Sequence, residues 1–371
     1  MTIFMKLLNN FTLVLILVIA LVPGYLIAQE TSPPTHQQAI SKSRQMIEKA
    51  MRDHPFPGMA VAVSIKGELI WSAGFGVSDM KKATKVDPAK SKFRIGSVSK
   101  PITAVGLAKL YEEGKADLDA PIQTYVPDFP QKKYAISLRQ LAGHLAGIRH
   151  YRGLEFMNRL KYETVADGLD IFKADTLLFE PGTKYAYSSY GWNLISAAME
   201  GAADTDFLSY IDQTVFRPLK MRNTCADHAD QNIPGRVKFY VLSKDKIVEA
   251  AYVDNSYKWA GGGFLSTAED LIRFGNAQLY AKLLKPETIE LFRTPQQTTD
   301  GKSTNYGMGW TTGEDKKGRA WFGHSGGSVG GTTFLIIYPE TEMVFAGMVN
   351  LSSAPLGDLM FRVANQFFQT P

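Results

Sequence analysis

A hydroxyl and an amine lie three residues apart in Ser97-Val98-Ser99-Lys100. The apolar run that continues to Gly114 has proline in its first turn and glycine at its end, which predicts a helix. Residues i and i+3 are neighbours on a helix, so we expect the Lys100 amine to reach the Ser97 hydroxyl. Serine needs an adjacent base to act as a nucleophile, and a lysine whose pKa is lowered by burial can be that base. The pair therefore predicts nucleophilic catalysis by Ser97, with the positive end of the helix dipole favouring a developing oxyanion.

Context separates this pair from two other Ser-x-x-Lys matches. Short motifs recur by chance, and this one also occurs at Ser78–Lys81 and Ser243–Lys246. Both of these lie among charged residues, which predicts solvated turns. Only Ser97 leads into a helix with a buried face, so Ser97 is the candidate nucleophile.

Ser328 is the rival candidate, because Gly326-Gly-Ser-Val-Gly330 has the form of a Gly-x-Ser-x-Gly nucleophile elbow. That motif needs a helix after the serine and a histidine downstream. Residues 332–338 predict a strand instead, and no histidine follows His324. We therefore do not expect Ser328 to be the nucleophile, and the glycines predict a close approach of backbone segments.

The sequence predicts neither a metal site nor a cofactor. Its six histidines lack paired ligand spacing, Cys225 is the only cysteine, and there is no glycine-rich phosphate loop. Asp227-His-Ala-Asp230 is more typical of a solvated loop than of a ligand cluster. His144 and His150 flank a glycine turn, where we expect residues at a helix end or behind the reacting groups.

Two further segments could supply partners for Ser97. Tyr187 lies on a turn before a helix that Ser188 or Ser189 is expected to cap. A tyrosine beside an ammonium has its phenolate favoured and can relay a proton. His324 lies in Trp321–Gly327, which predicts a short strand edge whose exposed amide could be an oxyanion donor. On these grounds alone, Tyr187 is equally consistent with a half-buried packing role, and the His324 segment with a capped turn.

Composition and charge set the class of protein. The chain has 371 residues, of which 45% are hydrophobic and 21% are charged, as in a globular protein. The net charge of +5 comes without a dense Lys/Arg run, so we expect no nucleic-acid partner. The apolar run Phe11–Val22 predicts a signal peptide over 1–28 and a periplasmic or secreted protein. The alternative is an N-terminal membrane anchor with the rest of the chain outside, and residues 29–36 are a predicted linker.

The order of elements indicates an α+β fold. We expect a helix over 37–53, strands over 59–65, 69–75, 331–338 and 343–350, and a last helix over 355–368. Between them we expect a helix opened by the Ser137–Gln140 capping box, a helix over 192–201 and a hairpin of 237–242 with 247–252. The predicted domain, 37–371, is an antiparallel sheet flanked by the terminal helices, with an inserted mostly helical region. Residues 37–97 and 256–371 would form the α/β part and 98–255 the helical insertion, with the site between them.

Taken together, the motifs resemble those of the serine β-lactamase-like and penicillin-binding protein superfamily. Ser97-x-x-Lys100, Tyr187-Ser-Ser189 and His324-Ser-Gly326 occur in the order of that superfamily, and the similarity extends over roughly residues 37–369. The branch is the one with class C β-lactamases, DD-peptidases, D-aminopeptidases and related esterases. Four segments look like its group of mitochondrial serine β-lactamase-like proteins and their bacterial relatives: 93–100, 125–130, 145–151 and 324–330.

The resemblance implies a role for each of these residues. Ser97 would be acylated, Lys100 would be its base, and Tyr187 would carry the proton to the leaving group and later help to activate water. His324 would stand where the family usually has lysine, and Ser189 where it often has asparagine. The backbone amides of Ser97 and Gly327 would form the oxyanion hole, and substrate would contact Ser189, Ser325, Gly326 and Gly327.

Two departures from the family pattern favour substrates other than antibiotics. Ser189 is shorter than asparagine, and His324 lacks the permanent charge that lysine would offer a carboxylate. We therefore predict a secreted serine hydrolase that forms an acyl-enzyme on Ser97 and cleaves a small peptide or amide. The alternatives are a carboxylesterase, a β-lactamase or penicillin-binding DD-peptidase, and a non-catalytic assembling scaffold with the same fold.

Overall fold

Residues 34–368 are the part of the chain that the computed structural model describes. The predicted signal peptide or anchor, 1–28, lies outside this range, so export stays a prediction. The predicted linker, 29–36, overlaps helix α1 (Pro34–Asp53), because proline is well tolerated in a first helical turn. Among the helices of residues 34–368, none is both long and apolar enough to cross a membrane.

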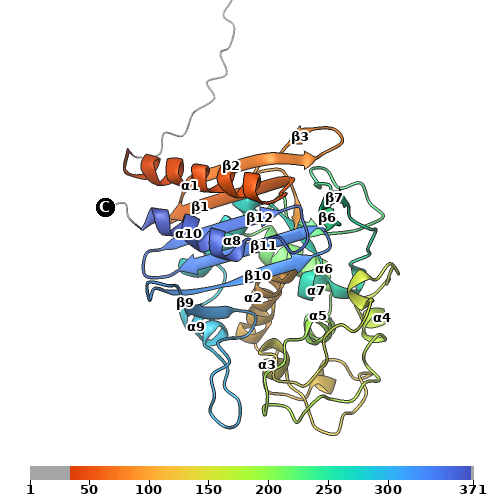
Figure 1. Ribbon diagram of the computed structural model, residues 1–371. Helices are drawn as coiled ribbons and strands as arrows, with labels where there is room; N and C mark the ends of the chain where they lie inside the picture. The colour runs from red at the N-terminus through yellow and green to blue at the C-terminus, as the bar shows by residue number, and fades with distance from the viewer. Residues whose placement is uncertain (1–33, 369–371) are drawn as a thin grey trace, which may run out of the picture. The chain divides into compact units, whose positions relative to one another are not determined.

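A seven-stranded antiparallel sheet forms the centre of the fold (Figure 1), in the order β3-β2-β1-β12-β11-β10-β9. Its strands are β1 (Gly58–Ile65), β2 (Glu68–Asp79), β3 (Thr84–Lys85), β9 (Thr311–Glu314), β10 (Ala320–Ser328), β11 (Gly331–Tyr338) and β12 (Met343–Val349). Strand β1 pairs with β12, with Met59 opposite Val349, so the N-terminal and C-terminal parts of the domain share one sheet. The predicted α+β fold with an antiparallel sheet is confirmed.

Both faces of the central strands are covered, which explains their continuous apolar sequences. Successive side chains of a strand point to opposite faces. On β1, Met59 and Val61 pack in a core with α1 and the last helix, α10 (Gly357–Phe367). Ala60 and Ala62 belong to a second core that contains α8 (Ala268–Leu279) and the helical part of the molecule.

The helical part lies between the two halves of the sheet in the sequence. Its helices are α2 (Ser99–Glu112), α3 (Leu138–Ala142), α4 (Val165–Leu169), α5 (Ser189–Ala203), α6 (Phe207–Ile211), α7 (Trp259–Gly262) and α9 (Pro286–Arg293). Short helical turns are η1 (Gly96–Val98), η2 (Ile122–Thr124), η3 (Glu155–Met157), η4 (Asp212–Phe216) and η5 (Ser256–Lys258). A small sheet has the order β4 (Phe93–Arg94), β8 (Phe264–Ser266), β5 (Cys225–Ala226), and β6 (Tyr240–Ser243) pairs with β7 (Lys246–Glu249).

Local signals in the sequence placed several of these elements well. The Ser137–Gln140 capping box is present at α3, and α5 begins after Ser188, whose side chain accepts a hydrogen bond from the Gly191 amide. The expected single buried face of α2 was too narrow a prediction. Residues Ser99 to Ala108 are all buried, because α2 packs against α5 and α7 as well as near β10.

Strand β10 differs from the short edge expected around His324. It has nine residues and pairs with β11 along Phe322–Ser328, while β9 covers its other side only along Ala320–Gly323. The second half of β10 is thus free of a strand neighbour on that side, where η1 packs instead. The open edge is therefore local, and Ser97 lies beside it.

Candidate active site

Ser97 and Lys100 meet where η1 continues into α2. The Lys100 Nζ lies 2.9 Å from the Ser97 Oγ, 3.2 Å from the Ser189 Oγ and 2.6 Å from the Gly261 carbonyl oxygen, to which it donates. The Lys100 side chain is fully buried, whereas Ser97 is half-buried. The expected contact between the serine hydroxyl and the lysine amine is thus present.

Burial favours the neutral form of the Lys100 amine. Its pKa is lowered well below the ordinary lysine value, first by burial and second by the nearby charge of Lys258. Among the described residues, no carboxylate forms an ion pair with this amine. An amine of this kind can accept a proton from a serine hydroxyl at neutral pH.

Glycines bring η1 and β10 into backbone contact. Gly96 has a φ of +50°, and a Cβ there would lie 2.5 Å from the Gly327 carbonyl oxygen. A Cβ on Gly326 would lie 1.9 Å from the Ile95 carbonyl oxygen and 3.2 Å from the Ser97 nitrogen. Two segments that are far apart in sequence thus place the amides of Ser97 and Gly327 side by side.

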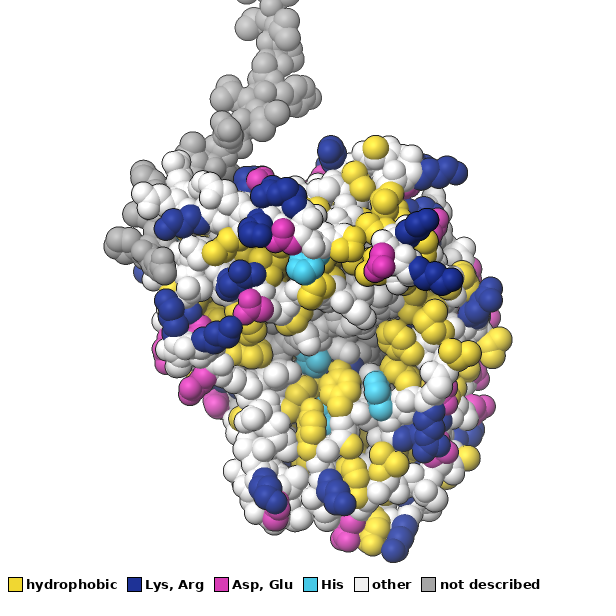
Figure 2. Space-filling view, in the orientation of Figure 1, with side chains coloured by type: hydrophobic (Ala, Val, Ile, Leu, Met, Phe, Trp, Pro, Cys, Tyr) yellow, Lys and Arg dark blue, Asp and Glu magenta, His cyan; other side chains and the backbone are white. Residues whose placement is uncertain are grey.

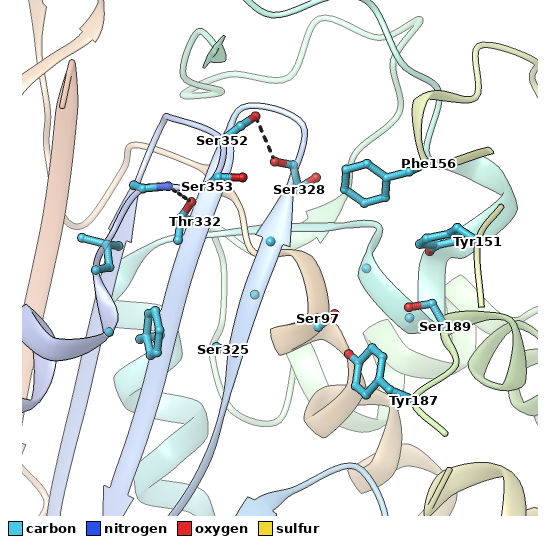
Figure 3. A pocket seen from close by; sticks show the side chains of 18 of the residues that line it. Ser97, Tyr151, Phe156, Tyr187, Ser189, Ser325, Ser328, Thr332, Ser352 and Ser353 are labelled. Carbon is cyan, nitrogen blue, oxygen red and sulfur yellow. Dashed lines mark hydrogen bonds between the residues drawn. The ribbon is translucent and has the colours of Figure 1, made fainter. Parts of the chain in front are cut away.

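Tyr187 lies next to the serine and lysine. The Lys100 Nζ is 4.8 Å from the centre of the Tyr187 ring, and the Tyr187 hydroxyl points toward Ser97 in Figure 3. Burial raises the pKa of the Tyr187 phenol, and its hydrogen bond with Ser97 opposes that shift only in part. The expectation of a favoured phenolate is therefore wrong, because burial, the largest effect, raises the pKa and keeps Tyr187 a protonated phenol.

His324 is buried behind the cleft rather than exposed on its wall. Its Nδ1 lies 2.5 Å from the Ser325 carbonyl oxygen, which can only accept, so Nδ1 carries the proton and Nε2 accepts from the Tyr306 hydroxyl at 2.9 Å. Burial and the charge of Lys100 lower the pKa of His324 to about 3. The strand position that the family usually fills with lysine is therefore neutral in this protein.

A cleft of about 510 Å³ opens above Ser97 between the sheet and the helical part. Figure 2 shows a hollow on this face, bordered by hydrophobic and histidine side chains. In Figure 3, Tyr187, Ser189, Tyr151 and Phe156 follow one another along one wall, opposite Ser325 and Ser328 on the strands. All the expected site residues except Lys100 and His324 line this cleft, and those two support it from below.

The histidines of the glycine turn hold the Tyr187 segment in place. The His144 Nδ1 accepts a hydrogen bond from the Ser188 amide, and the His150 Nδ1 accepts one from the Ser189 amide, both at 3.1 Å. These two amides lie at the start of α5, so the expectation of histidines at a helix end is confirmed. His150 also lines the cleft.

The rival nucleophile, Ser328, lies in the wrong local structure. It is the last residue of β10, and the chain turns directly into β11 instead of into a helix. Its hydroxyl is buried and has no hydrogen-bond partner among the described residues. The elbow interpretation is therefore excluded by the β10–β11 hairpin.

The predicted solvated loop at Asp227–Asp230 is wrong for its first residue. Asp227 is fully buried, and its carboxylate accepts from the Arg94 Nε at 2.6 Å and from the Asn255 Nδ2 at 2.8 Å. A second arginine, Arg236, lies 3.3 Å away. Over residues 34–368, no group of three or more His, Cys, Asp or Glu side chains is arranged to hold a metal ion.

Sequence reasoning missed Lys258, which lines the cleft although only 2% of its surface is exposed. It lies directly before Trp259-Ala-Gly-Gly262, the segment whose Gly261 carbonyl accepts from Lys100. A lysine between two aromatic residues, followed by the four small residues 260–263, is the signal that the sequence offers. That signal is too weak to place Lys258 without the fold.

The comparisons with known proteins agree with this fold and site. A family model described as Beta-lactamase matches residues 44–366. The chain is 32% identical to the human "Serine beta-lactamase-like protein LACTB, mitochondrial", over 91% of this chain and 82% of that protein. The octameric penicillin-binding protein homologue from Pyrococcus abyssi has a TM-score of 0.77 at 24% identity, covering 90% of this chain and 78% of that one. A D-stereospecific amidohydrolase from Streptomyces sp. has a TM-score of 0.72 at 23% identity, covering 84% of this chain and 94% of that one.

The two structural matches show a shared fold, and the family model and the human relative extend the likeness to sequence over nearly the whole described range. The resemblance expected from the three ordered motifs is confirmed. The chain therefore belongs to the beta-lactamase family.

Proposed function

We propose that this protein is a serine hydrolase that is acylated on Ser97 and cleaves amide or peptide bonds. The observation that carries the proposal is the 2.9 Å contact between the Ser97 Oγ and the buried amine of Lys100. A lysine held neutral next to a half-exposed hydroxyl at the floor of a cleft is the arrangement that activates a serine.

In the proposed reaction, the Ser97 Oγ bonds to the substrate carbonyl carbon while its proton passes to the Lys100 amine. The oxyanion is held by the amides of Ser97 and Gly327. The bond to the leaving amine then breaks as the Tyr187 phenol protonates the departing nitrogen, and the Lys100 ammonium returns a proton to Tyr187. Water then attacks the acyl carbon while its proton passes through Tyr187 to the Lys100 amine. Lys100 returns a proton to the Ser97 Oγ as the acyl C–O bond breaks and the acid leaves.

The protonated state of Tyr187 favours amides over esters. An amine is a poor leaving group unless it is protonated, whereas an activated alcohol leaves without help. Burial keeps the Tyr187 proton in place, and the hydroxyl points at Ser97. The likeness in fold to a D-stereospecific amidohydrolase supports the same class of substrate.

Efficient β-lactam turnover has less support. The neutral His324 gives the strand no fixed positive charge for the carboxylate of an antibiotic. Among the described residues that line the cleft there is also no Asp or Glu that could serve as a separate base for deacylation. We expect a penicillin to acylate Ser97 and to clear slowly.

A substrate panel tests the proposal. The full chain is incubated with a library of L- and D-peptide amides, a p-nitrophenyl ester and a chromogenic cephalosporin, and initial rates are compared. Hydrolysis of peptide or amide bonds is the expected result. Turnover of the ester alone would make the protein a carboxylesterase, fast turnover of the cephalosporin would make it a β-lactamase, and no turnover would leave the scaffold alternative.

Gly326→Ala is expected to lower the acylation rate about 10²-fold, the cost of misplacing one oxyanion donor. The new Cβ would meet only backbone atoms, so no side chain can rotate away, and β10 must move off η1. We expect a loss of about 1–3 kcal/mol in unfolding free energy from the same overpacking. The measurements are the labelling rate with a fluorophosphonate and urea unfolding.

Gly313→Ala is the matched control on the neighbouring strand. A Cβ there would make an ordinary contact of 3.4 Å with the Trp321 ring, away from η1. Its labelling rate is expected to equal that of the unchanged protein. An unchanged labelling rate in Gly326→Ala would show that the β10–η1 contact does not build the oxyanion hole.

A further inference from the structure

Lys258 is a buried cation that faces the cleft without a counter-charge. Its ammonium lies 4.4 Å from the centre of the Phe156 ring, 5.3 Å from that of Tyr257 and 5.8 Å from that of Tyr151. Across residues 34–368, no carboxylate or other acceptor makes an ion pair or hydrogen bond with it. Ring faces attract a cation but compensate only part of the cost of burying it.

Asp227, the carboxylate whose charge acts on Lys258, already has other partners. Asp227 accepts hydrogen bonds from Arg94, Arg236 and Asn255, so it acts on Lys258 only at a distance. Burial is the largest cause that lowers the pKa of Lys258, and the charge of Arg94 lowers it further. Asp227 raises the pKa only in part, so its value falls to about 7. The free protein thus holds an ammonium that a bound anion would stabilise.

The position of Lys258 relative to Tyr187 shows which part of a substrate it can meet. Tyr187 is the proposed proton donor to the leaving group, so the leaving group lies on its side of Ser97. Lys258 packs with Tyr151 and Phe156, which lie farther along the same wall, beyond Ser189 (Figure 3). An anion that reaches Lys258 therefore belongs to the acyl part of the substrate.

We propose that Lys258 binds a carboxylate on the acyl part of the substrate and makes the enzyme selective for acidic acyl groups. This inference rests on the proposed acylation of Ser97. In this proposal, the positive charge of the cleft comes from Lys258 in the helical part of the molecule. His324, on strand β10, is neutral and does not provide one. A hydrogen bond to a charged group contributes about 10- to 100-fold in affinity.

A matched pair of esters tests the inference. The mono-p-nitrophenyl ester of adipic acid and p-nitrophenyl 5-carbamoylpentanoate have achiral acyl chains of equal length that end in a carboxylate or an amide. We expect the unchanged protein to have the higher kcat/KM for the carboxylate ester. Lys258→Met is expected to lower the ratio of the two kcat/KM values about 10- to 100-fold, and Lys258→Arg to keep part of the preference.

The ratio separates a binding role from an indirect one. The charge of Lys258 also lowers the pKa of Lys100, but a change in the base affects both esters alike and cancels in the ratio. Lys161→Met is the control for long-range charge, because Lys161 is an exposed lysine that pairs with Glu163 and Asp230. Its ratio is expected to stay unchanged.

Two failures of the test have different meanings. Hydrolysis of both esters with the same ratio in Lys258→Met would overturn the role of Lys258 and leave the proposed function intact. Hydrolysis of neither ester, with no covalent label on Ser97, would overturn the proposed function. In that case, calorimetry measures the binding of adipate to the unchanged protein and to Lys258→Met. Adipate that binds equally to both proteins, or to neither, would overturn the role of Lys258.

Discussion

Ser97→Ala is expected to abolish covalent labelling and to lower the rate of amide hydrolysis about 10⁶-fold, the order of magnitude seen when a catalytic serine is removed. The substitution removes the atom that bonds to the substrate, while the cleft and both oxyanion amides remain. The fold should be unaffected, because the half-buried hydroxyl contributes one hydrogen bond with Lys100 and one with Tyr187. Intact-protein mass spectrometry after fluorophosphonate treatment and initial rates on an amide measure the two effects.

Ser328→Ala is the control that addresses the rival nucleophile. Ser328 lines the same cleft and its hydroxyl lacks a partner, so a reagent that enters the cleft can reach its neighbourhood. The mass shift and its rate are expected to match those of the unchanged protein. A label that persists in Ser97→Ala and disappears in Ser328→Ala would reverse the assignment of the nucleophile.

The sequence was sufficient to predict features that depend on residues close together in the chain. The three-residue spacing of Ser97 and Lys100 and the start of α5 at Ser188 follow from helix geometry and capping. The strand that carries His324, β10, was predicted in type but not in length. Its pairing with β9 depends on Thr311–Glu314, which carries no strong strand signal of its own.

Features that depend on tertiary burial could not be predicted in this way. Asp227 is in a charged tetrapeptide typical of loops, and the approach of Arg94 from 133 residues away helps to make it a buried ion pair. The neutral state of His324 likewise depends on Tyr306 and on burial. Lys258 is the clearest case, because its importance lies in the absence of a partner, which a sequence does not record.

Lys100→Met is expected to lower the acylation rate about 10²- to 10⁴-fold, the usual contribution of a general base. Methionine fills a similar volume but cannot take the proton of Ser97. The structure should tolerate the change, because two opposing effects on stability are of similar size. The variant no longer buries an amine that burial disfavours, but the Gly261 carbonyl loses its donor, at a cost of about 1–3 kcal/mol.

The pH dependence of stability supplies an independent test of the Lys100 charge state. The pKa of Lys100 is lowered in the folded protein, so between that value and the ordinary lysine value of 10.5 the unfolded chain binds one more proton than the folded one. Stability rises with pH wherever the unfolded state binds more protons, by up to about 1.4 kcal/mol per pH unit for one group. The difference in unfolding free energy between the unchanged protein and Lys100→Met should therefore increase from pH 7 to pH 9 in urea titrations.

Other titrating groups, Lys258 among them, are present in both proteins, so to first order their contributions cancel. A difference that is flat with pH would mean that Lys100 is charged throughout, and a charged Lys100 could not be the base that activates Ser97.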